Sequence, residues 1–319
     1  LWGAGQLRTL IANTKAAFDA HRKDVATRVG GGFIRQCHGD LHLKNIFLDN
    51  GAPVLFDCIE FDDRLSDIDV LYDLAFLVMD ILHVGQRGGA NRLINGYFDQ
   101  ALRSFGENSL AGIALLPLYL SLRASVRAHV SAQMGRTEEG QIYLREALGY
   151  LQKKEPSLMA VGGLSGTGKT TFARARAPAF GPPPGAVVLR SDEIRKRLWG
   201  VLPQERLPES AYTKMESERV YKTMFDETRQ ILRAGCAVIL DAVFLTPEER
   251  ERCARLAQDE GVAFEGYWLE APPDILRRRI AARRNDASDA DLNVLELQLA
   301  RDPGDINWQK LDATAPTSS

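Results

Sequence analysis

The hydrophobic positions along the chain follow one pattern in the first half and another in the second. Between residues 7 and 29 apolar side chains recur at helical spacing and predict one helix, which three consecutive glycines at 30–32 end. Short strands are predicted at 33–36 and 54–56, and helical periodicity returns from 67 to 150. This half is therefore expected to be mostly helical, with small strand pairs.

A charged stretch at 152–156 ends in a helix-breaking proline, and the pattern changes after it. Beyond it we predict strands at 158–161, 186–189, 237–240 and 263–268, and helices at 169–177, 193–199, 211–234, 247–260 and 273–284. Strands that alternate with helices predict a parallel sheet covered on both faces, which is the α/β class. We therefore expect two domains, 1–152 and 157–312.

Composition adds little to this division but excludes some classes of protein. A length of 319 residues suits two domains, and 40 Lys plus Arg against 42 Asp plus Glu argue against a dedicated nucleic-acid binder. Four scattered cysteines predict neither a disulfide framework nor a structural zinc, which favours the cytoplasm. The longest apolar run, 110–122, is shorter than a membrane span and predicts a buried core helix. Nothing in the sequence indicates an oligomeric state.

One segment fits the phosphate-binding pattern G-x-x-x-x-G-K-[ST], between a predicted strand and a predicted helix. The residues expected to hold a nucleotide are Gly163, Ser165, Gly166, Thr167, Gly168, Lys169, Thr170 and Thr171. In such a loop the backbone N–H groups surround phosphate oxygens, Lys169 neutralises the β and γ phosphates, and the Thr170 hydroxyl ligates Mg2+. ATP and Mg2+ are the expected cofactors; a glycine-rich turn without a ligand is the alternative.

Two acidic residues follow later strands of the same predicted sheet. Asp192 is placed to accept a proton from a substrate hydroxyl, with Arg195 about one turn on and facing the same way, although Asp192 also fits a cap of the helix from Glu193. Asp241 directly follows the strand 237–240, in the position of a carboxylate that holds Mg2+ through water. A substrate contact or a turn role remain alternatives for Asp241.

An arginine-rich helix follows, with Arg277, Arg278, Arg279, Arg283 and Arg284. Such a run is usually a solvated surface. Arg279 and Arg283, however, share one helix face, and an arginine-bearing lid is a common means of neutralising a transferring phosphoryl group. Ser288 to Asp291 predicts the cap of a further helix.

These motifs resemble the P-loop small-molecule kinases that include gluconate kinase, chloramphenicol phosphotransferase, zeta-type toxins and polynucleotide 5'-kinases. The resemblance rests on GLSGTGKT, on Asp192-x-x-Arg195 and on L-x-x-R-I-x-x-R from 276 to 283, and covers about 158–308. It implies that Asp192 is a general base and that arginines of the lid hold the phosphates. It does not identify the phosphate acceptor.

The first half contains His38-Gly39-Asp40 followed by Asn45, which fits H-x-D-x-x-x-x-N, the catalytic loop of kinases. Asp57 follows the strand 54–56. The spacing resembles the aminoglycoside phosphotransferase family and implies that Asp40 is the base and that Asn45 and Asp57 bind Mg2+. The whole chain resembles bacterial fusions of such a region with a P-loop ATP-binding domain.

One departure from that family concerns the upper lobe. The 37 residues before His38 are predicted to be helical, so they supply neither a Gly-rich strand pair nor a Lys-bearing strand over the nucleotide. The first half is therefore expected to be a lower, kinase-like lobe without its nucleotide-binding partner. His42 is expected to be a hydrogen-bonded core residue rather than a metal ligand.

Three functions are compatible with these residues. The first is an ATP- and Mg2+-dependent kinase of a small hydroxylated molecule, favoured because a plain ATPase has no need of an Arg-flanked base. The second is a nucleic-acid end kinase, which the balanced charge makes less favoured. The third is a regulatory or scaffold protein whose P-loop domain switches with ATP while the kinase-like lobe binds a ligand.

Overall fold

The computed structural model describes residues 3–282 and 287–315. Contacts within the chain divide it into two compact units, Leu1–Lys154 and Glu155–Ser319. Each unit has its own secondary structure and its own buried apolar residues.

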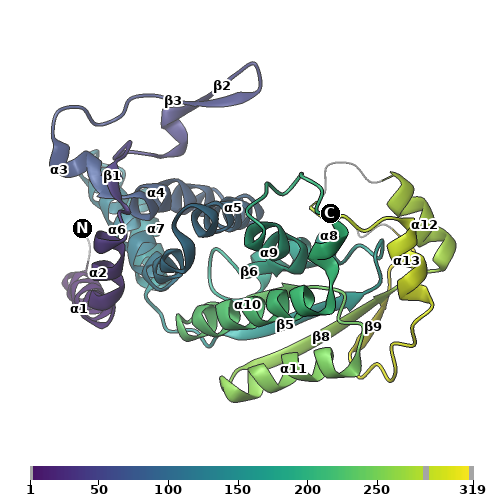
Figure 1. Ribbon diagram of the computed structural model, residues 1–319. Coiled ribbons are helices and arrows are strands. Elements are labelled where there is room, and N and C mark those ends of the chain that lie inside the picture. The colour runs from purple at the N-terminus through teal and green to yellow at the C-terminus, as the bar shows by residue number, and fades with distance from the viewer. Residues whose placement is uncertain (1–2, 283–286, 316–319) are drawn as a thin grey trace. The chain divides into compact units, whose positions relative to one another are not determined.

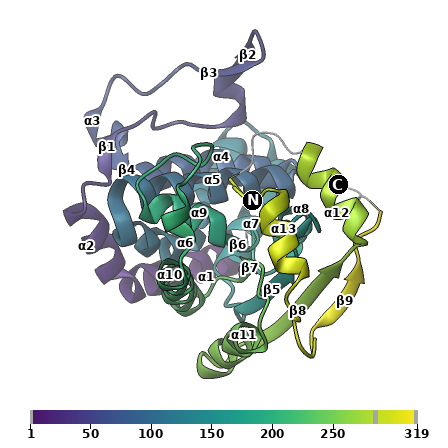
Figure 2. The same cartoon turned by 45° about the vertical axis from the view of Figure 1, so that its right-hand side comes forward.

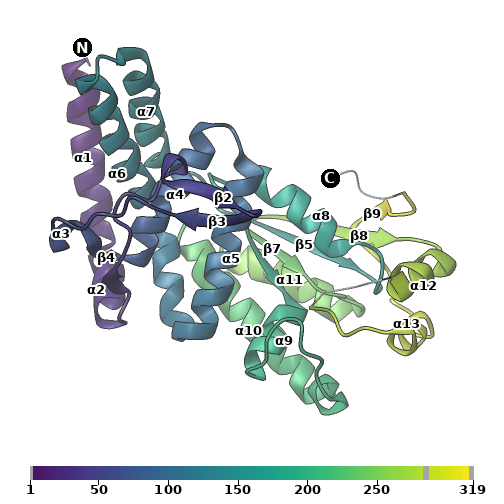
Figure 3. The same cartoon turned by 90° about the horizontal axis from the view of Figure 1, so that it is seen from above.

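Helices make up most of the first unit. They are α1 Ala4–Ala20, α2 Arg22–Gly30, α3 Asp63–Ser66, α4 Val70–His83, α5 Arg87–Phe105, α6 Ala111–Gln133 and α7 Thr137–Tyr150, with the 3-10 turns η1 Leu43–Asn45 and η2 Gly106–Leu110. Helix α6 packs against α4 and α7, and Figure 3 shows α1, α6 and α7 side by side. The single helix predicted for 7–29 is wrong, because the backbone leaves helical geometry at His21.

Helix α6 contains the apolar run predicted as a core helix. Among the described residues, Arg87–Gln133 is long and apolar enough to cross a membrane, and 72% of its most apolar window is buried. Helix α6 alone buries twelve of its residues, Arg123 among them. Burial of this extent is expected of the core helix of a folded unit.

Two antiparallel strand pairs complete the first unit. Strand β1 Ile34–Gln36 pairs with β4 Asp67–Asp69, and β2 Ile46–Asp49 pairs with β3 Ala52–Leu55. The expected mostly helical body with short strand pairs is therefore confirmed. Strand β2 was not predicted from the sequence, and β4 lies where helical periodicity was expected from residue 67.

A buried ion pair joins α2 to the junction of β4 and α4. The guanidinium of Arg28 donates to both carboxylate oxygens of Asp69, at 2.5 and 2.6 Å, and the two residues are 0% and 6% exposed. Asp69 also accepts from the Leu71 N–H and the Tyr119 hydroxyl. The carboxylate thus connects three elements of the unit.

The second unit is a five-stranded parallel sheet in the order β6-β7-β5-β8-β9, as far as the chain is described. Its strands are β5 Ser157–Gly163, β6 Val187–Arg190, β7 Val238–Asp241, β8 Ala263–Glu270 and β9 Gln309–Asp312. Its helices are α8 Lys169–Arg176, α9 Ser191–Leu198, α10 Lys214–Arg233, α11 Pro247–Asp259, α12 Pro273–Ala282 and α13 Leu292–Leu299, with the turns η3 Ala177–Ala179 and η4 Glu209–Tyr212. The predicted α/β class is confirmed.

Helices cover both faces of this sheet. Helix α8 packs Phe172 and Ala173 on the face formed by Met159, Val161 and Ile239, and Figure 1 shows α11 on the opposite side. Strand β5 is almost fully buried, as expected of a central parallel strand. Figure 2 shows α12 and α13 near the ends of β8 and β9.

The register of the strands brings three chain positions to one edge. Asp241, the last residue of β7, lies opposite Val161 of β5 and opposite Arg190, the last residue of β6. The loop that begins at Gly163 leaves β5 just beyond this level. The carboxyl ends of parallel strands are where α/β proteins bind their ligands.

Candidate active site

The loop after β5 turns at glycines. Gly163 has φ 136°, and a Cβ there would lie 2.5 Å from the Leu269 carbonyl oxygen of β8. Gly166 has φ 87°, and a Cβ there would lie 3.0 Å from the Leu276 carbonyl oxygen of α12. Both positions require glycine, because their backbone conformation is strained for other residues and backbone atoms fill the space. The loop is thus packed directly against β8 and α12.

The side chains of this loop are held by its own backbone. Ser165 and Thr167 are buried, and the Thr167 hydroxyl donates to the Leu164 carbonyl at 2.8 Å. The Lys169 ammonium donates to the same carbonyl at 3.0 Å, so it folds back over the loop. Thr171, in the first turn of α8, is exposed. The Lys169 ammonium thus lies against the loop, where the sequence predicted a cation for the phosphates.

Thr170 and Asp241 meet at the base of the loop. The Thr170 hydroxyl donates to Asp241 Oδ2 at 2.6 Å, and Asp241 is 5% exposed. Arg190 Nε lies 3.3 Å from the same carboxylate oxygen, and Arg190 Nη1 donates to Glu193 at 2.8 Å. The sequence-predicted pair of hydroxyl and carboxylate is therefore brought together, and a buried arginine, not expected from the sequence, lies beside it.

Asp192 lies inside α9 rather than before it. The helix begins at Ser191, and the residue in the N-cap position is Arg190, whose side chain makes no capping hydrogen bond. The alternative that Asp192 caps a helix from Glu193 is therefore wrong, because helical geometry begins two residues earlier than the sequence indicated. An acidic residue in the first turn still interacts favourably with the helix dipole.

The surroundings of Asp192 change its proton affinity. Desolvation raises the pKa of this carboxyl, and the nearby Asp241 raises it further. Arg190, a hydrogen bond from Ser288 and the charge of Lys169 act in the opposite direction, but the net pKa is above the usual value. Asp192 thus lies within electrostatic reach of the loop lysine and is bonded to a hydroxyl group. A carboxyl with a raised pKa is suited to accept a proton from an alcohol.

Arg195 binds protein groups rather than the phosphate loop. Its Nη1 donates to the Ala211 carbonyl at 2.6 Å, and its Nη2 lies 3.4 Å from the Ser217 hydroxyl. Its guanidinium also lies 4.9 Å from the centroid of the Tyr212 ring. Arg195 is 8% exposed, so in this conformation it fixes η4 and the start of α10 beside Asp192.

Arg279 of α12 reaches the phosphate loop. Its Nη1 is 3.4 Å from the Gly166 carbonyl oxygen, and its Nη2 donates to the Thr314 carbonyl at 3.1 Å. Arg278 bonds only to a carbonyl of its own helix in the described part of the chain, that of Asp274. Arg283, the second predicted lid arginine, lies outside the described residues. One of the two arginines is thus located at the loop.

Helix α13 also contacts the loop. The Ser165 N–H donates to Gln298 Oε1 at 2.8 Å, and Leu295 packs with Leu276 and Ile280 of α12. The cap of α13 is Asp291, which accepts from the Val294 N–H, and not the predicted Ser288. Ser288 is bonded to Asp192 instead. Contacts between α13 and the loop had no sequence signal, since glutamine at a helix surface is common.

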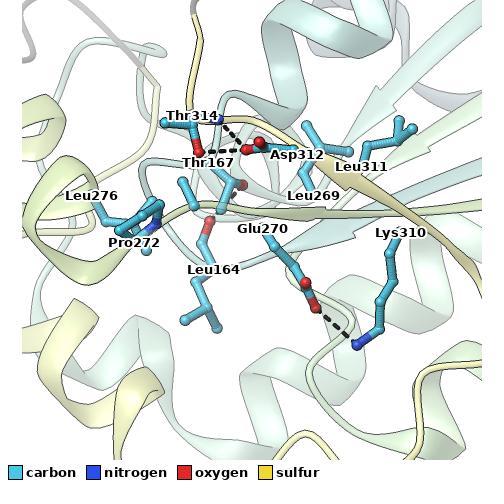
Figure 4. A pocket seen from close by; sticks show the side chains of 11 residues that line it. Leu164, Thr167, Leu269, Glu270, Pro272, Leu276, Lys310, Leu311, Asp312 and Thr314 are labelled. Carbon is cyan, nitrogen blue, oxygen red and sulfur yellow. Dashed lines mark hydrogen bonds and ion pairs between the residues drawn. The ribbon is translucent and has the colours of Figure 1, made fainter.

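A cavity of about 510 Å3 lies between the phosphate loop and the ends of β8 and β9. It is lined by Leu164, Thr167, Leu269, Glu270, Ala271, Pro272, Leu276, Lys310, Leu311, Asp312 and Thr314. Figure 4 shows Glu270 and Lys310 joined at one end, at 3.2 Å, and Asp312 joined to Thr314 at another. Apart from these groups and Thr167, the residues that line the cavity are apolar, as is usual for a small-molecule site.

The first unit brings together two of its three predicted site residues. Asn45 Nδ2 donates to the Asp40 carbonyl and to Asp40 Oδ2, at 3.0 and 3.3 Å. The buried His42 ring also bonds to Asp40, and this bond lowers the pKa of the Asp40 carboxyl. Asp57 is exposed, has φ 59°, and makes no hydrogen bond or ion pair within the described residues.

Asp73 and Arg123 hold the loop that carries Asp40. Asp73 accepts from the His38 and Gly39 N–H groups at 3.0 and 2.9 Å. Arg123 donates to the Gly39 carbonyl at 3.1 Å and lies 3.6 Å from the Asp73 carboxylate. No group of three or more His, Cys, Asp or Glu side chains that could hold a metal ion occurs among residues 3–282 and 287–315.

Comparison with known families assigns both halves. Residues 4–112 match the phosphotransferase enzyme family, and residues 158–302 match the family described as AAA domain. The chain joins a phosphotransferase region to a P-loop domain. The expected order of the two regions, a phosphotransferase-like one followed by a P-loop one, is therefore confirmed.

Individual relatives cover different parts of the chain. An uncharacterised protein of Mycobacterium tuberculosis is 34% identical over 301 residues, which are 91% of this chain and 58% of the relative. The chain thus spans little more than half the length of that curated relative. Adenylyl-sulfate kinase of Myxococcus xanthus is 29% identical over 117 residues, 37% of this chain and 59% of its own. A gluconokinase structure from Sinorhizobium meliloti is 20% identical and covers 51% of this chain and 86% of its own, with a TM-score of 0.36.

Several residues of the P-loop domain's site were not found by sequence reasoning. These are Arg190, Tyr212, Ser288, Asp289 and Gln298. Arg190 had a usable signal, because it directly follows the strand predicted at 186–189. The others lie far from the motif in sequence, and their side chains meet it only through the packing of α12, α13 and η4.

Proposed function

We propose that the P-loop domain transfers the γ-phosphoryl group of ATP to a hydroxyl group of a small molecule. The observation that carries this proposal is the position of Asp192. Its carboxyl has a raised pKa, is bonded to a hydroxyl, and lies within electrostatic reach of Lys169 and Asp241. A base at the acceptor and a cation at the phosphates are the two groups that phosphoryl transfer to an alcohol needs.

In the proposed reaction, the acceptor hydroxyl gives its proton to Asp192 while its oxygen attacks the γ phosphorus. The bond from the γ phosphorus to the bridging oxygen breaks, and ADP leaves. Lys169 and the loop N–H groups hold the β and γ phosphates. Arg279, already at the Gly166 carbonyl, compensates charge on the transferring group.

The donor groups present fit Mg2+. A hydroxyl and a carboxylate oxygen, those of Thr170 and Asp241, lie 2.6 Å apart below the loop, and hard oxygen donors are what this ion prefers. When bound, the ion would neutralise phosphate charge. We assign Thr170 as a direct ligand and Asp241 as a ligand through water.

We assign the adenine ring of ATP to the cavity at the ends of β8 and β9, where Leu164 and Thr167 of the phosphate loop form part of the lining. Adenylyl-sulfate kinase, which matches part of this domain, is by name a kinase of a small molecule and supports the acceptor class. The near-zero net charge disfavours a nucleic-acid acceptor. A cytoplasmic location is part of the same proposal.

The test is a screen for ADP release stimulated by acceptors. Sugars, aminoglycosides, nucleosides and short oligonucleotides are supplied to the purified protein with MgATP, and the Lys169→Ala variant is the matched control. We expect a hydroxylated small molecule to stimulate release in the wild type and none to do so in the variant, because the phosphates lose their fixed cation. Slow turnover that no acceptor changes would instead favour an ATP-switched regulatory protein.

A further inference from the structure

The carboxylate of Asp289 is surrounded by donors from one neighbouring segment. Lys196 Nζ donates to its Oδ1 at 2.7 Å, and the Leu207 N–H and the Tyr212 hydroxyl donate to its Oδ2 at 3.0 and 2.6 Å. Lys196 is 1% exposed, and its ammonium also donates to the Glu205 carbonyl. These three donors, which we call the anion cradle, form a built site for a negatively charged group.

The cradle keeps Asp289 ionised. Burial alone would raise the pKa of this carboxyl, but the hydrogen bonds from Lys196, Tyr212 and the Leu207 N–H lower it below its usual value. The Arg195 guanidinium lies 4.9 Å from the ring of Tyr212 and adds positive charge nearby. The anion cradle therefore favours an anion over a neutral group.

The cradle lies next to the proposed base. Asp192 and Lys196 are four residues apart in α9, hence on one face and separated by about 6 Å along the helix axis. Ser288, the neighbour of Asp289, is hydrogen bonded to Asp192. In the dipeptide Ser288-Asp289, the hydroxyl of Ser288 therefore bonds to the proposed base Asp192, and the carboxylate of Asp289 lies in the anion cradle.

We propose that Ser288 and Asp289 occupy the acceptor site in place of the acceptor, and that the acceptor carries a hydroxyl together with a carboxylate or phosphate group. This inference rests on the proposed function and narrows its substrate class to hydroxylated anions. The acceptor displaces residues 288–289, its hydroxyl takes the position of the Ser288 hydroxyl, and its anionic group takes that of the Asp289 carboxylate. Lys196 and Tyr212 then determine specificity.

The experiment is a calorimetric titration without ATP, using glucitol and two anions that each differ from it at a single terminal carbon: gluconate, with a carboxylate, and glucitol 6-phosphate, with a phosphate. The wild type should bind one or both anions more tightly than glucitol, and the comparison of the two anions separates carboxylate from phosphate. Asp289→Asn should raise the affinity for the anion roughly tenfold, because the internal competitor has lost its charge. Lys196→Met and Tyr212→Phe should each reduce the preference for the anion.

The Asp274→Asn variant, on exposed α12 surface, is the control and should bind as the wild type does. Tyr212→Phe tests the cradle even if Lys196→Met does not fold, since Tyr212 is 42% exposed. Equal binding of glucitol and both anions, or weaker anion binding in Asp289→Asn, would overturn the inference. If neutral polyols stimulate ADP release as strongly as the anions do, the result would support a kinase but would contradict a role of the anion cradle in acceptor binding. If the anions bind and the variants change their affinity as expected, but no ADP is released, the result would count against the kinase and support the anion site.

Discussion

The Thr170 hydroxyl and the Asp241 carboxylate are in direct hydrogen-bond contact, although 71 residues separate them in the sequence. The contact joins the first turn of α8 to the end of β7, so a helix start and a strand end together fix the position of the proposed metal ligands. Replacing Thr170 by Val keeps the shape of the side chain and removes the hydroxyl. We expect turnover to fall by roughly 10² or more, since a ligand of the ion and the contact to Asp241 are both lost. Turnover measured over a range of Mg2+ concentrations checks this. An unchanged Mg2+ dependence would place the ion elsewhere.

The raised pKa of Asp192 predicts an acidic limb in the pH profile of phosphoryl transfer. The carboxyl accepts a proton only when ionised, so activity should rise with pH through a pKa above the ordinary value of 3.8. Asp192→Asn should remove this limb and lower kcat by roughly 10² to 10⁴, with nearly unchanged ATP affinity. Asp226→Ala, an exposed aspartate of α10, is the control. Full transfer activity in Asp192→Asn would show that it is not the base.

Arg279 and Arg278 are adjacent on α12 and form a matched pair. Arg279 reaches the phosphate loop, whereas Arg278 bonds to its own helix. Arg279→Ala should lower kcat more than it weakens ATP binding, because the charge it compensates is largest in the transition state. Arg278→Ala should change neither. Steady-state kinetics together with nucleotide titration separate the two effects, and equal losses in kcat and affinity would indicate binding of ground-state phosphate.

The phosphotransferase region is expected to leave ATP turnover by this chain unaffected. Asp40 and Asn45 are in contact, but Asp57 is exposed and separate from them, and carboxylates open to water bind Mg2+ weakly. The Asp40→Ala, Asp57→Ala double variant should therefore turn over ATP at the wild-type rate and bind one nucleotide per chain. A stoichiometry near two, with one site lost in Asp57→Ala, would show a working second site.

The Arg28–Asp69 pair predicts a large stability effect in the first unit. Arg28→Leu leaves the Asp69 carboxylate buried without its ionic partner, which should cost about 3 to 5 kcal/mol of unfolding free energy. The Arg28→Leu, Asp69→Asn double variant should recover part of this loss. Urea unfolding followed by circular dichroism measures both. A loss below about 1 kcal/mol would mean that water or other donors compensate Asp69.

The sequence predicted those parts of the site that local rules govern. The loop 163–170 needs glycine at two strained positions and a Lys-Thr pair at a helix start, and each of these requirements is visible in the residue order. Asp241 could be placed because it ends an aliphatic strand. The partners of Asp192 could not, since Ser288 reaches it through the packing of segments distant in sequence. Likewise, the orientation of the Arg195 side chain depends on its contacts with η4, a segment whose sequence has no periodic pattern of apolar residues.

Strand β9 comes last among the described strands, yet it supplies Lys310, Leu311 and Asp312 to the cavity beside the phosphate loop. During synthesis on the ribosome, the phosphate loop leaves the exit tunnel with β5, long before β9 is translated. The nascent second unit therefore contains the residues proposed to bind the phosphates before it contains all the residues that line the cavity assigned to adenine. Under the proposed assignment, ATP can stabilise this unit against early unfolding or proteolysis only once translation has passed β9.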